Sequence, residues 1–336
     1  MHPRNNLRFF PLALFLLCGS LGAQQPAAQA PAQPAGSGQQ QPQKPQPGQA
    51  PTREEGGVFV FKAYSEEVQL HATVLDDKRR FVTTLNRDDF AIWENGVPQK
   101  ITSFRREDIP VAVAIIIDNS GSMRDKRPAV NQAALNFVRA SNPNDEVCIV
   151  NFNDEYYLDQ DFTSQIPLLK EALERIESRG GTALYDAVVA TADHLKKNAR
   201  LEKKALLVVT DGEDNASRES LEQAIRRLQV ENGPVVYTIG LLGDEHQRRA
   251  QRALKAMAEE TGGVSFFPKD LGEVDSITQE VAHDIRNQYT IGYRPSTPQS
   301  QGGYRTIKVE AHSTGHKRLM VRTRSGYYPG PQRASN

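Results

Sequence analysis

The sequence predicts an α/β protein: a doubly wound, mainly parallel sheet flanked by helices, with a small accessory β module from the two flanks. Three observations predict this class. A continuous apolar run fills residues 111–117, as in a strand that helices cover on both faces. Strand-like and helix-like segments then alternate as far as residue 287. On either side of this region lie short strand-like segments separated by turn residues.

The first 23 residues have the order of a secretory signal peptide. Arg4 and Arg8 precede an apolar run over residues 9–17, and small residues follow up to Ala23. The run is short for a membrane-spanning helix, so we expect cleavage near Ala23 and no insertion into the bilayer afterwards. The predicted location is the periplasm, the cell envelope or the exterior. An uncleaved N-terminal anchor is the alternative.

Residues 24–56 are predicted to be a disordered linker. They consist mainly of Gln, Pro, Ala and Gly and contain no large apolar residue. Such a segment cannot bury enough apolar surface to offset the entropy lost on folding.

Residues 57–109 are predicted to form an N-terminal β segment. Apolar and polar residues alternate from Val68 to Val74, which is the pattern of a half-buried strand. A turn follows at residues 76–78. The pair Asn95-Gly96 is typical of a tight β-hairpin.

Residues 110–287 are predicted to be the α/β domain. After the first strand, a helix is expected from Pro128 to Ala140, because proline suits the first helical turn. Further strands are expected at 146–152, 205–210, 235–240 and 264–267, and further helices at 165–177, 184–197, 218–230, 246–260 and 271–287.

Residues 288–329 are predicted to form a C-terminal β segment, and residues 330–336 a tail. Strands are expected at 289–293, 304–311 and 319–324, separated by Pro and Gly. We expect them to join the N-terminal strands in one β module, although two separate small sheets remain an alternative.

Polar side chains come from three separate segments of the α/β domain. Asp118, Ser120 and Ser122 follow the first strand, Thr182 precedes a helix, and Asp211 follows the strand at 205–210. The carboxyl ends of parallel strands form the ligand-binding edge of an open sheet, so we expect these side chains to meet there. Glycine at 121, 180 and 181 lets the loops bend and approach closely.

These five residues offer only oxygen donors. Hard oxygen ligands suit Mg²⁺ in the first place, with Mn²⁺ and Ca²⁺ as alternatives, and do not suit zinc. Two carboxylates and three hydroxyls do not saturate a dication, so the ion is expected to favour an anionic ligand from outside. The expected partner is a protein that supplies an Asp or Glu carboxylate.

The set of motifs resembles the metal-ion-dependent adhesion site of von Willebrand factor A domains. The matching residues are Asp118-x-Ser120-x-Ser122, then Thr182, then Thr210-Asp211-Gly212. The resemblance covers residues 110–287. It implies that Asp118, Ser120 and Ser122 contact the ion, while Thr182 and Asp211 bind it directly or through water. The flanks, with Glu94-Asn95-Gly96 and Tyr289-x-Ile291-Gly292-Tyr293, are similar to the VWFA-related proteins abundant in acidobacteria.

Other classes of function have weaker support. The 41 basic and 41 acidic residues balance, which gives no electrostatic reason to expect nucleic acid as a partner. No Gly-x-Ser-x-Gly elbow surrounds Ser120 or Ser122, and Ser120 stands where an aspartyl phosphatase has a second acid. The segment 211–215 lacks the spacing of a calcium loop and is expected to be a solvated turn.

The leading hypothesis is therefore an exported, non-enzymatic adhesion or assembly module that captures a partner's acidic residue through a divalent ion. One alternative is a structural or envelope-assembly scaffold whose ion only stabilises the fold. A metal-dependent hydrolase is the less favoured alternative.

Overall fold

The computed structural model describes residues 67–106, 108–174, 178–242, 248–298, 301–316 and 318–330. These residues belong to one compact unit of the chain. The predicted signal peptide, the linker, and the tail beyond its first residue lie outside them. Among the helices in these ranges, none combines the length and apolar character needed to cross a membrane.

The centre of the α/β part is a six-stranded sheet in the order β10-β9-β8-β5-β6-β7. All neighbours pair in parallel except β6 and β7, which are antiparallel. The eight residues of β5 are all buried, as the apolar run predicts. The strands are β5 (Val111–Asp118), β6 (Glu146–Phe152), β7 (Tyr156–Thr163), β8 (Lys203–Thr210), β9 (Val235–Gly240) and β10 (Ser265–Phe266).

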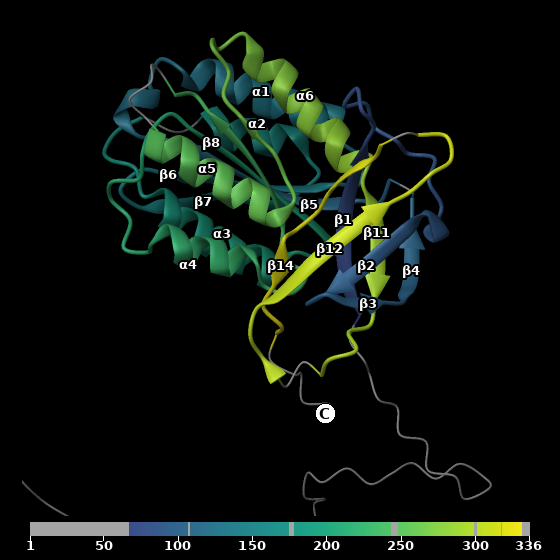
Figure 1. Ribbon diagram of the computed structural model, residues 1–336. Helices are drawn as coiled ribbons and strands as arrows, with labels where there is room; N and C mark the ends of the chain where they lie inside the picture. The colour runs from purple at the N-terminus through teal and green to yellow at the C-terminus, as the bar shows by residue number, and fades with distance from the viewer. Residues whose placement is uncertain are drawn as a thin grey trace, which may run out of the picture. The chain divides into compact units, whose positions relative to one another are not determined.

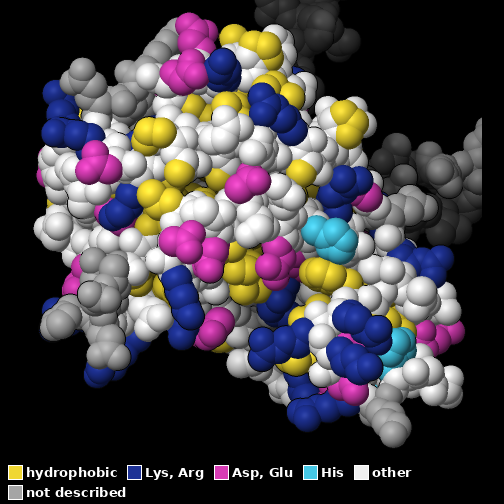
Figure 2. Space-filling model, turned by 90° about the horizontal axis from the view of Figure 1, so that it is seen from above, with side chains coloured by type: hydrophobic (Ala, Val, Ile, Leu, Met, Phe, Trp, Pro, Cys, Tyr) yellow, Lys and Arg dark blue, Asp and Glu magenta, His cyan; other side chains and the backbone are white. Residues whose placement is uncertain are grey.

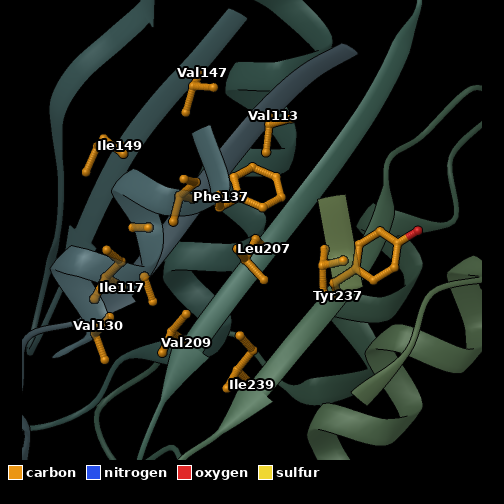
Figure 3. Close-up of a cluster of buried hydrophobic side chains, with 14 of the residues drawn as sticks. Val113, Ile117, Val130, Phe137, Val147, Ile149, Leu207, Val209, Tyr237 and Ile239 are labelled. Carbon is orange, nitrogen blue, oxygen red and sulfur yellow. The ribbon is translucent and has the colours of Figure 1, made fainter. Parts of the chain in front are cut away.

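Three helices pack on each face of this sheet (Figure 1). Val113, Ile115 and Ile117 of β5 point to one face, whose core Figure 3 shows, and the residues between them point to the other. The first face carries α1 (Arg127–Ala140), α2 (Ile166–Glu174) and α6 (Glu273–Arg286); the second carries α3 (Leu184–Asn198), α4 (Leu221–Leu228) and α5 (Arg248–Thr261). The predicted fold class is confirmed.

Strand β7 and the start of α4 differ from the sequence prediction. Strand β7 was not expected, because its exposed first three residues, Tyr-Tyr-Leu, and its irregular pairing with β6 hide the alternation of a half-buried strand. Helix α4 begins at Leu221 and not at residue 218, because the Ser220 hydroxyl accepts a hydrogen bond from the Gln223 N–H and caps the helix there.

The chain segments on either side of the α/β part form two further four-stranded sheets (Figure 1). Each contains strands from both ends: β1 pairs with β11, and β2 pairs with β12. The first sheet has the order β13-β1-β11-β4 and the second β14-β12-β2-β3. The strands are β1 (Val68–Leu75), β2 (Phe90–Glu94), β3 (Val97–Gln99), β4 (Ile101–Arg105), β11 (Tyr289–Tyr293), β12 (Arg305–Ala311), β13 (Met320–Arg322) and β14 (Gly326–Tyr327).

The two sheets enclose one hydrophobic core, so the flanks form a single β sandwich and not two independent sheets. Its hairpin between β2 and β3 turns at Asn95 and Gly96, with φ of 50° and 79°. Positive φ at both central residues is the geometry that an Asn-Gly hairpin favours, as expected from the sequence.

The sandwich is bonded to the α/β part through the end of α6. The Asp284 carboxylate accepts a hydrogen bond from Thr73 Oγ1 of β1 at 2.8 Å and pairs with Arg322 of β13. After α6, the Gln288 amide donates to the Tyr237 hydroxyl of β9 at 3.1 Å. These contacts link both flanks to the helix that ends the α/β part.

A buried ion pair lies inside the sandwich. Arg305 and Glu94 are about 2% exposed, and Arg305 Nη1 lies 3.1 Å from Glu94 Oε1. The hydroxyls of Tyr293 and Tyr327 donate to Glu94 Oε2 at 2.5 and 2.8 Å. Every charged oxygen of Glu94 is therefore hydrogen-bonded, which offsets the cost of burying it.

Replacing Glu94 by Ala is predicted to lower the free energy of unfolding by about 3–5 kcal/mol, because Arg305 stays buried without its carboxylate. Urea denaturation of the full chain measures the loss. Glu310→Ala, a partly exposed glutamate on β12, is the control and should cost roughly 0.5 kcal/mol or less. Equal losses in the two variants would contradict a special role for the buried pair.

Lys203 gives the fold a predicted pH dependence. Its side chain is buried, its ammonium donates to the Ile285 carbonyl, and burial lowers the pKa of Lys203 to about 8. The unfolded chain keeps this proton up to a pH of about 10.4. Stability should therefore rise as pH increases from about 8 to about 10.4, since the unfolded state then binds more protons. Lys203→Met should remove this rise in urea titrations; an unchanged rise would assign it to other groups.

Candidate metal site

The predicted site lies at the carboxyl edge of the central sheet. Strands β5 and β8 pair in parallel, with Ile117 opposite Val209, so they end side by side. Asp118 is the last residue of β5, and Asp211 follows the last residue of β8. The register of these two strands therefore brings two carboxylates from distant parts of the sequence to one place.

Hydrogen bonds connect four of the five predicted residues. Ser120 and Ser122 hold their hydroxyl oxygens 3.1 Å apart, and the Ser122 hydroxyl donates to Asp211 Oδ1 at 2.8 Å. The backbone N–H of Ser120 donates to Asp118 Oδ1 at 2.8 Å. Thr210, at the end of β8, donates from its hydroxyl to Asp118 Oδ2 at 2.6 Å. The loop after β5 and the end of β8 thus share one polar cluster.

Thr182 lies beside this cluster without a described hydrogen bond to the other four. Its backbone N–H donates to Asn215 Oδ1 at 2.9 Å, and its carbonyl accepts from Asn215 N at 3.0 Å. A Cβ atom added to Gly212 would lie 3.6 Å from Thr182 Oγ1, which places the hydroxyl next to the residue that follows Asp211. The structure therefore brings the fifth predicted residue to the edge of the cluster.

Backbone hydrogen bonds fasten the loops to one another. Gly121 N donates to Gly180 O at 3.2 Å, and Arg179 N donates to Asn119 O at 2.9 Å. Gly180 has a φ of 77°, and a Cβ atom there would lie 2.2 Å from Asp154 Oδ2. The positive φ favours glycine at this position, and a Cβ atom would also displace the Asp154 side chain.

Asp118 is fully buried, and this burial raises its pKa, while hydrogen bonds from Thr210 and Ser120 oppose the rise. The neighbouring Asp211 carboxylate raises the pKa further through charge repulsion. A cation near both carboxylates would relieve the desolvation cost and the repulsion together.

The structure adds one residue that sequence reasoning missed. The Lys126 ammonium pairs with Asp211 Oδ2; the Lys126 side chain is 30% exposed and that of Asp211 is 1% exposed. Lys126 lies four residues after Ser122, immediately before α1. No signal in the sequence identifies Lys126, because the contact joins the start of α1 to a residue 85 positions away.

The segment after Asp211 helps to build the site. Asp214 Oδ2 accepts hydrogen bonds from Tyr185 N at 3.1 Å and from the Ser217 hydroxyl at 2.5 Å. Asp214 therefore binds the first turn of α3. The expectation that this segment is simply a solvated turn is wrong for Asp214. Its negative charge at the helix N-terminus is stabilising.

The donor chemistry of the cluster fits a hard dication. Its side chains present carboxylate and hydroxyl oxygens, the ligands that Mg²⁺ and Ca²⁺ accept. Within the described ranges, no three His, Cys, Asp or Glu side chains gather into a metal-binding group. The candidate site differs from such a group, because only two of its five side chains are carboxylates.

Comparison with known proteins supports the fold. Residues 113–213 match the family model of the von Willebrand factor type A domain, and this segment runs from β5 to just beyond Asp211. No curated protein matches the chain.

Solved structures show distant similarity. A von Willebrand factor type A protein from Catenulispora acidiphila is 14% identical, with a TM-score of 0.45 over 80% of this chain and 75% of that one. The vWF domain of the type V pili tip protein Mfa5 from Porphyromonas gingivalis is 13% identical, with a TM-score of 0.44 over 53% and 95%. The PilB minor pilin from Streptococcus sanguinis is 14% identical, with a TM-score of 0.45; the alignment covers 54% of this chain and 62% of the pilin.

These solved structures are too distant to assign a function. The family match coincides with the strands and loops that carry Asp118, Thr182 and Asp211. The chain therefore contains a von Willebrand factor type A domain.

Proposed function

We propose that the chain is an exported, non-enzymatic protein-binding module that captures an Asp or Glu of its partner through a divalent ion. The observation that carries this proposal is the hydrogen-bonded cluster from Asp118 through the two serines to Asp211 at the carboxyl edge of the sheet. Four oxygen-bearing side chains are linked there by hydrogen bonds, and Thr182 lies at the edge of the cluster. Export rests on the basic, apolar and small-residue order of residues 1–23.

The charge of the site explains why the ion would bind a partner. Asp118 and Asp211 together neutralise a dication, while Ser120, Ser122 and Thr182 supply neutral oxygens. An ion held by these residues would leave part of its coordination sphere open to a carboxylate from outside. Mg²⁺ is the first candidate, and Mn²⁺ and Ca²⁺ are alternatives.

Lys126 gives the proposal a second feature. In the absence of a divalent ion, its ammonium supplies the positive charge beside Asp211. An ion bound at the cluster would compete with Lys126 for this carboxylate. The partly exposed lysine can turn towards solvent, because its flexible stem carries the charge on four carbons.

The same contact favours a second candidate function. If Lys126 is the permanent counter-ion of Asp211, the cluster only stabilises the loops and the domain serves as a scaffold. The two candidates differ in whether a divalent ion binds at all. A hydrolase is not proposed, because no Gly-x-Ser-x-Gly elbow surrounds Ser120 or Ser122, and Ser120 stands where an aspartyl phosphatase has a second acid.

Thermal unfolding of the chelator-treated full chain tests the ion site. Adding Mg²⁺, Mn²⁺ or Ca²⁺ should raise the melting temperature to saturation, with about 2.7 kcal/mol of stabilisation at a hundred times the dissociation constant. Asp118→Ala should abolish the rise. Asp193→Ala, an exposed carboxylate of α3, is the matched control and should keep it. No rise with any ion in the folded wild-type chain would contradict the proposal and favour the scaffold.

Replacing Lys126 by Met tests the competition between lysine and ion. Asp211 then stays buried without a counter-charge, so the ion-free chain should lose about 1–3 kcal/mol of stability. Mg²⁺ should bind roughly tenfold more tightly, because no ammonium competes for Asp211. Isothermal titration calorimetry measures the affinity, with the exposed Lys196→Met as control. A weaker affinity in Lys126→Met would show that Lys126 does not compete with the ion.

A further inference from the structure

A basic groove lies beside the candidate metal site, between α1 and α2. Its volume is about 880 Å³. Figure 2 looks onto the face where α1 and α6 lie, and shows basic side chains in dark blue spread among apolar ones in yellow. Of the described residues that line the groove, five are basic and one, Glu174, is acidic. The basic residues are Arg124, Arg127, Arg139, Lys170 and Arg179.

Four of the five basic side chains are exposed at the rim; only Arg127 is buried. The single acid has limited effect, because its closest approach to Lys170 is 3.7 Å on an exposed surface. Arg124 donates to the Ser178 carbonyl at 3.3 Å, and Arg139 donates to Asn136 Oδ1 at 3.1 Å. Neither bond neutralises a guanidinium, so the groove keeps a positive potential.

The groove begins at the loop that carries the metal site. Arg124 follows Ser122 by two residues. Ser178 and Arg179, which line the groove, bond to Asn119 between Asp118 and Ser120: Ser178 Oγ donates to Asn119 Oδ1 at 3.0 Å and Arg179 N donates to Asn119 O at 2.9 Å. A ligand held at the ion would therefore have this positive groove as its next contact.

The floor of the groove holds polar atoms that are not fully used. Arg127 is 5% exposed, and its Nη1 donates to Asn151 Oδ1 at 2.9 Å. Its Nε, and Oδ1 of the neighbouring Asn131, make no hydrogen bond with any described residue. Asn131 Nδ2 donates to Leu173 O at 2.8 Å, which fixes Oδ1 as the free acceptor. Both atoms are buried beneath this surface, so the exposed basic side chains at the rim are the groups that a ligand would meet.

We propose that this groove binds an acidic, extended segment of the partner protein, next to the carboxylate that the ion captures. The inference rests on the proposed function and names the class of partner. The first acid of the segment binds the ion, and the following acids lie among Arg124, Arg179 and Lys170. The exposed Pro128 ring at the rim contacts the aliphatic parts of the segment.

A nucleic acid is a poorer match for the groove than an acidic peptide. A polyanion of regular charge binds through a long basic surface with many phosphate contacts. Here the groove itself offers five basic residues, and the whole chain has zero formal net charge. The small extent of this basic surface favours a short acidic segment of a polypeptide.

The test uses the full chain and two fluorescent peptides of equal length in a Gly/Ser frame. One peptide has a single Asp; the other has the same Asp followed by three Glu. Fluorescence anisotropy with Mg²⁺ at low ionic strength gives the ratio of their affinities. The wild-type chain should prefer the four-acid peptide, and Arg124→Gln/Arg179→Gln should lower this preference roughly fivefold to tenfold. Arg252→Gln, an exposed arginine of α5, is the control and should keep the preference.

The outcomes separate this inference from the proposed function. An equal loss of preference in Arg252→Gln, or no loss in the groove variant, would overturn the groove assignment even if Mg²⁺ still promotes binding of the single-Asp peptide. The preference for the four-acid peptide could depend on the groove arginines and yet persist in the presence of chelator and in Asp118→Ala. That result would support peptide binding in the groove but overturn the metal bridge. No binding of either peptide at millimolar concentration would overturn the inference. Single-stranded DNA is the remaining comparison. If it binds more tightly than the four-acid peptide, without metal and through the same arginines, the groove binds a polyanion and the peptide assignment is overturned.

Discussion

The hydrogen bond from the Thr210 hydroxyl to the Asp118 carboxylate joins the ends of two central strands, and the candidate site depends on it. Both residues are fully buried, so the carboxylate is held at the sheet and not in solvent. Its second oxygen accepts the Ser120 N–H, which turns the chain out of β5 and sets the two serines towards Asp211. A short, buried and charge-assisted contact of this kind fixes geometry more firmly than exposed contacts do. The loops are then built around a fixed carboxylate.

Lys126 shows how the same cluster can remain stable with and without a dication. Two buried carboxylates close together repel each other and lose hydration, so some positive charge must accompany them. The ammonium supplies it from the start of α1, and the proposed ion would supply more charge at a position reached by both carboxylates. In this account, the free energy of metal binding is the gain from placing the ion beside the carboxylates minus the loss of the Lys126–Asp211 contact. The affinity would therefore be moderate, which suits an ion that must also accept a partner's carboxylate.

Much of the fold follows from the sequence, because the decisive signals are local. The apolar run of β5, the Asn-Gly turn and the alternation of strands and helices each depend on neighbouring residues only. The convergence of Asp118, Ser120, Ser122 and Asp211 also follows, since strand ends in a parallel sheet meet at one edge. Strand β7, the Lys126 contact and the α1–α2 groove could not be predicted in this way. Each depends on which distant elements pack together: β7 on the exposed edge of the sheet, Lys126 on the position of α1, and the groove on two helices separated by β6 and β7.

The most direct test of the central claim is a crystal structure of the chain soaked with Mn²⁺, with anomalous scattering used to locate the ion. The account predicts one strong peak bounded by Asp118, Ser120 and Ser122, close to Thr182 and Asp211, with the Lys126 ammonium moved away from Asp211. A peak absent from this cluster, with Lys126 still paired to Asp211, would contradict the claim that the site binds a divalent ion and would make the cluster a structural element of the scaffold.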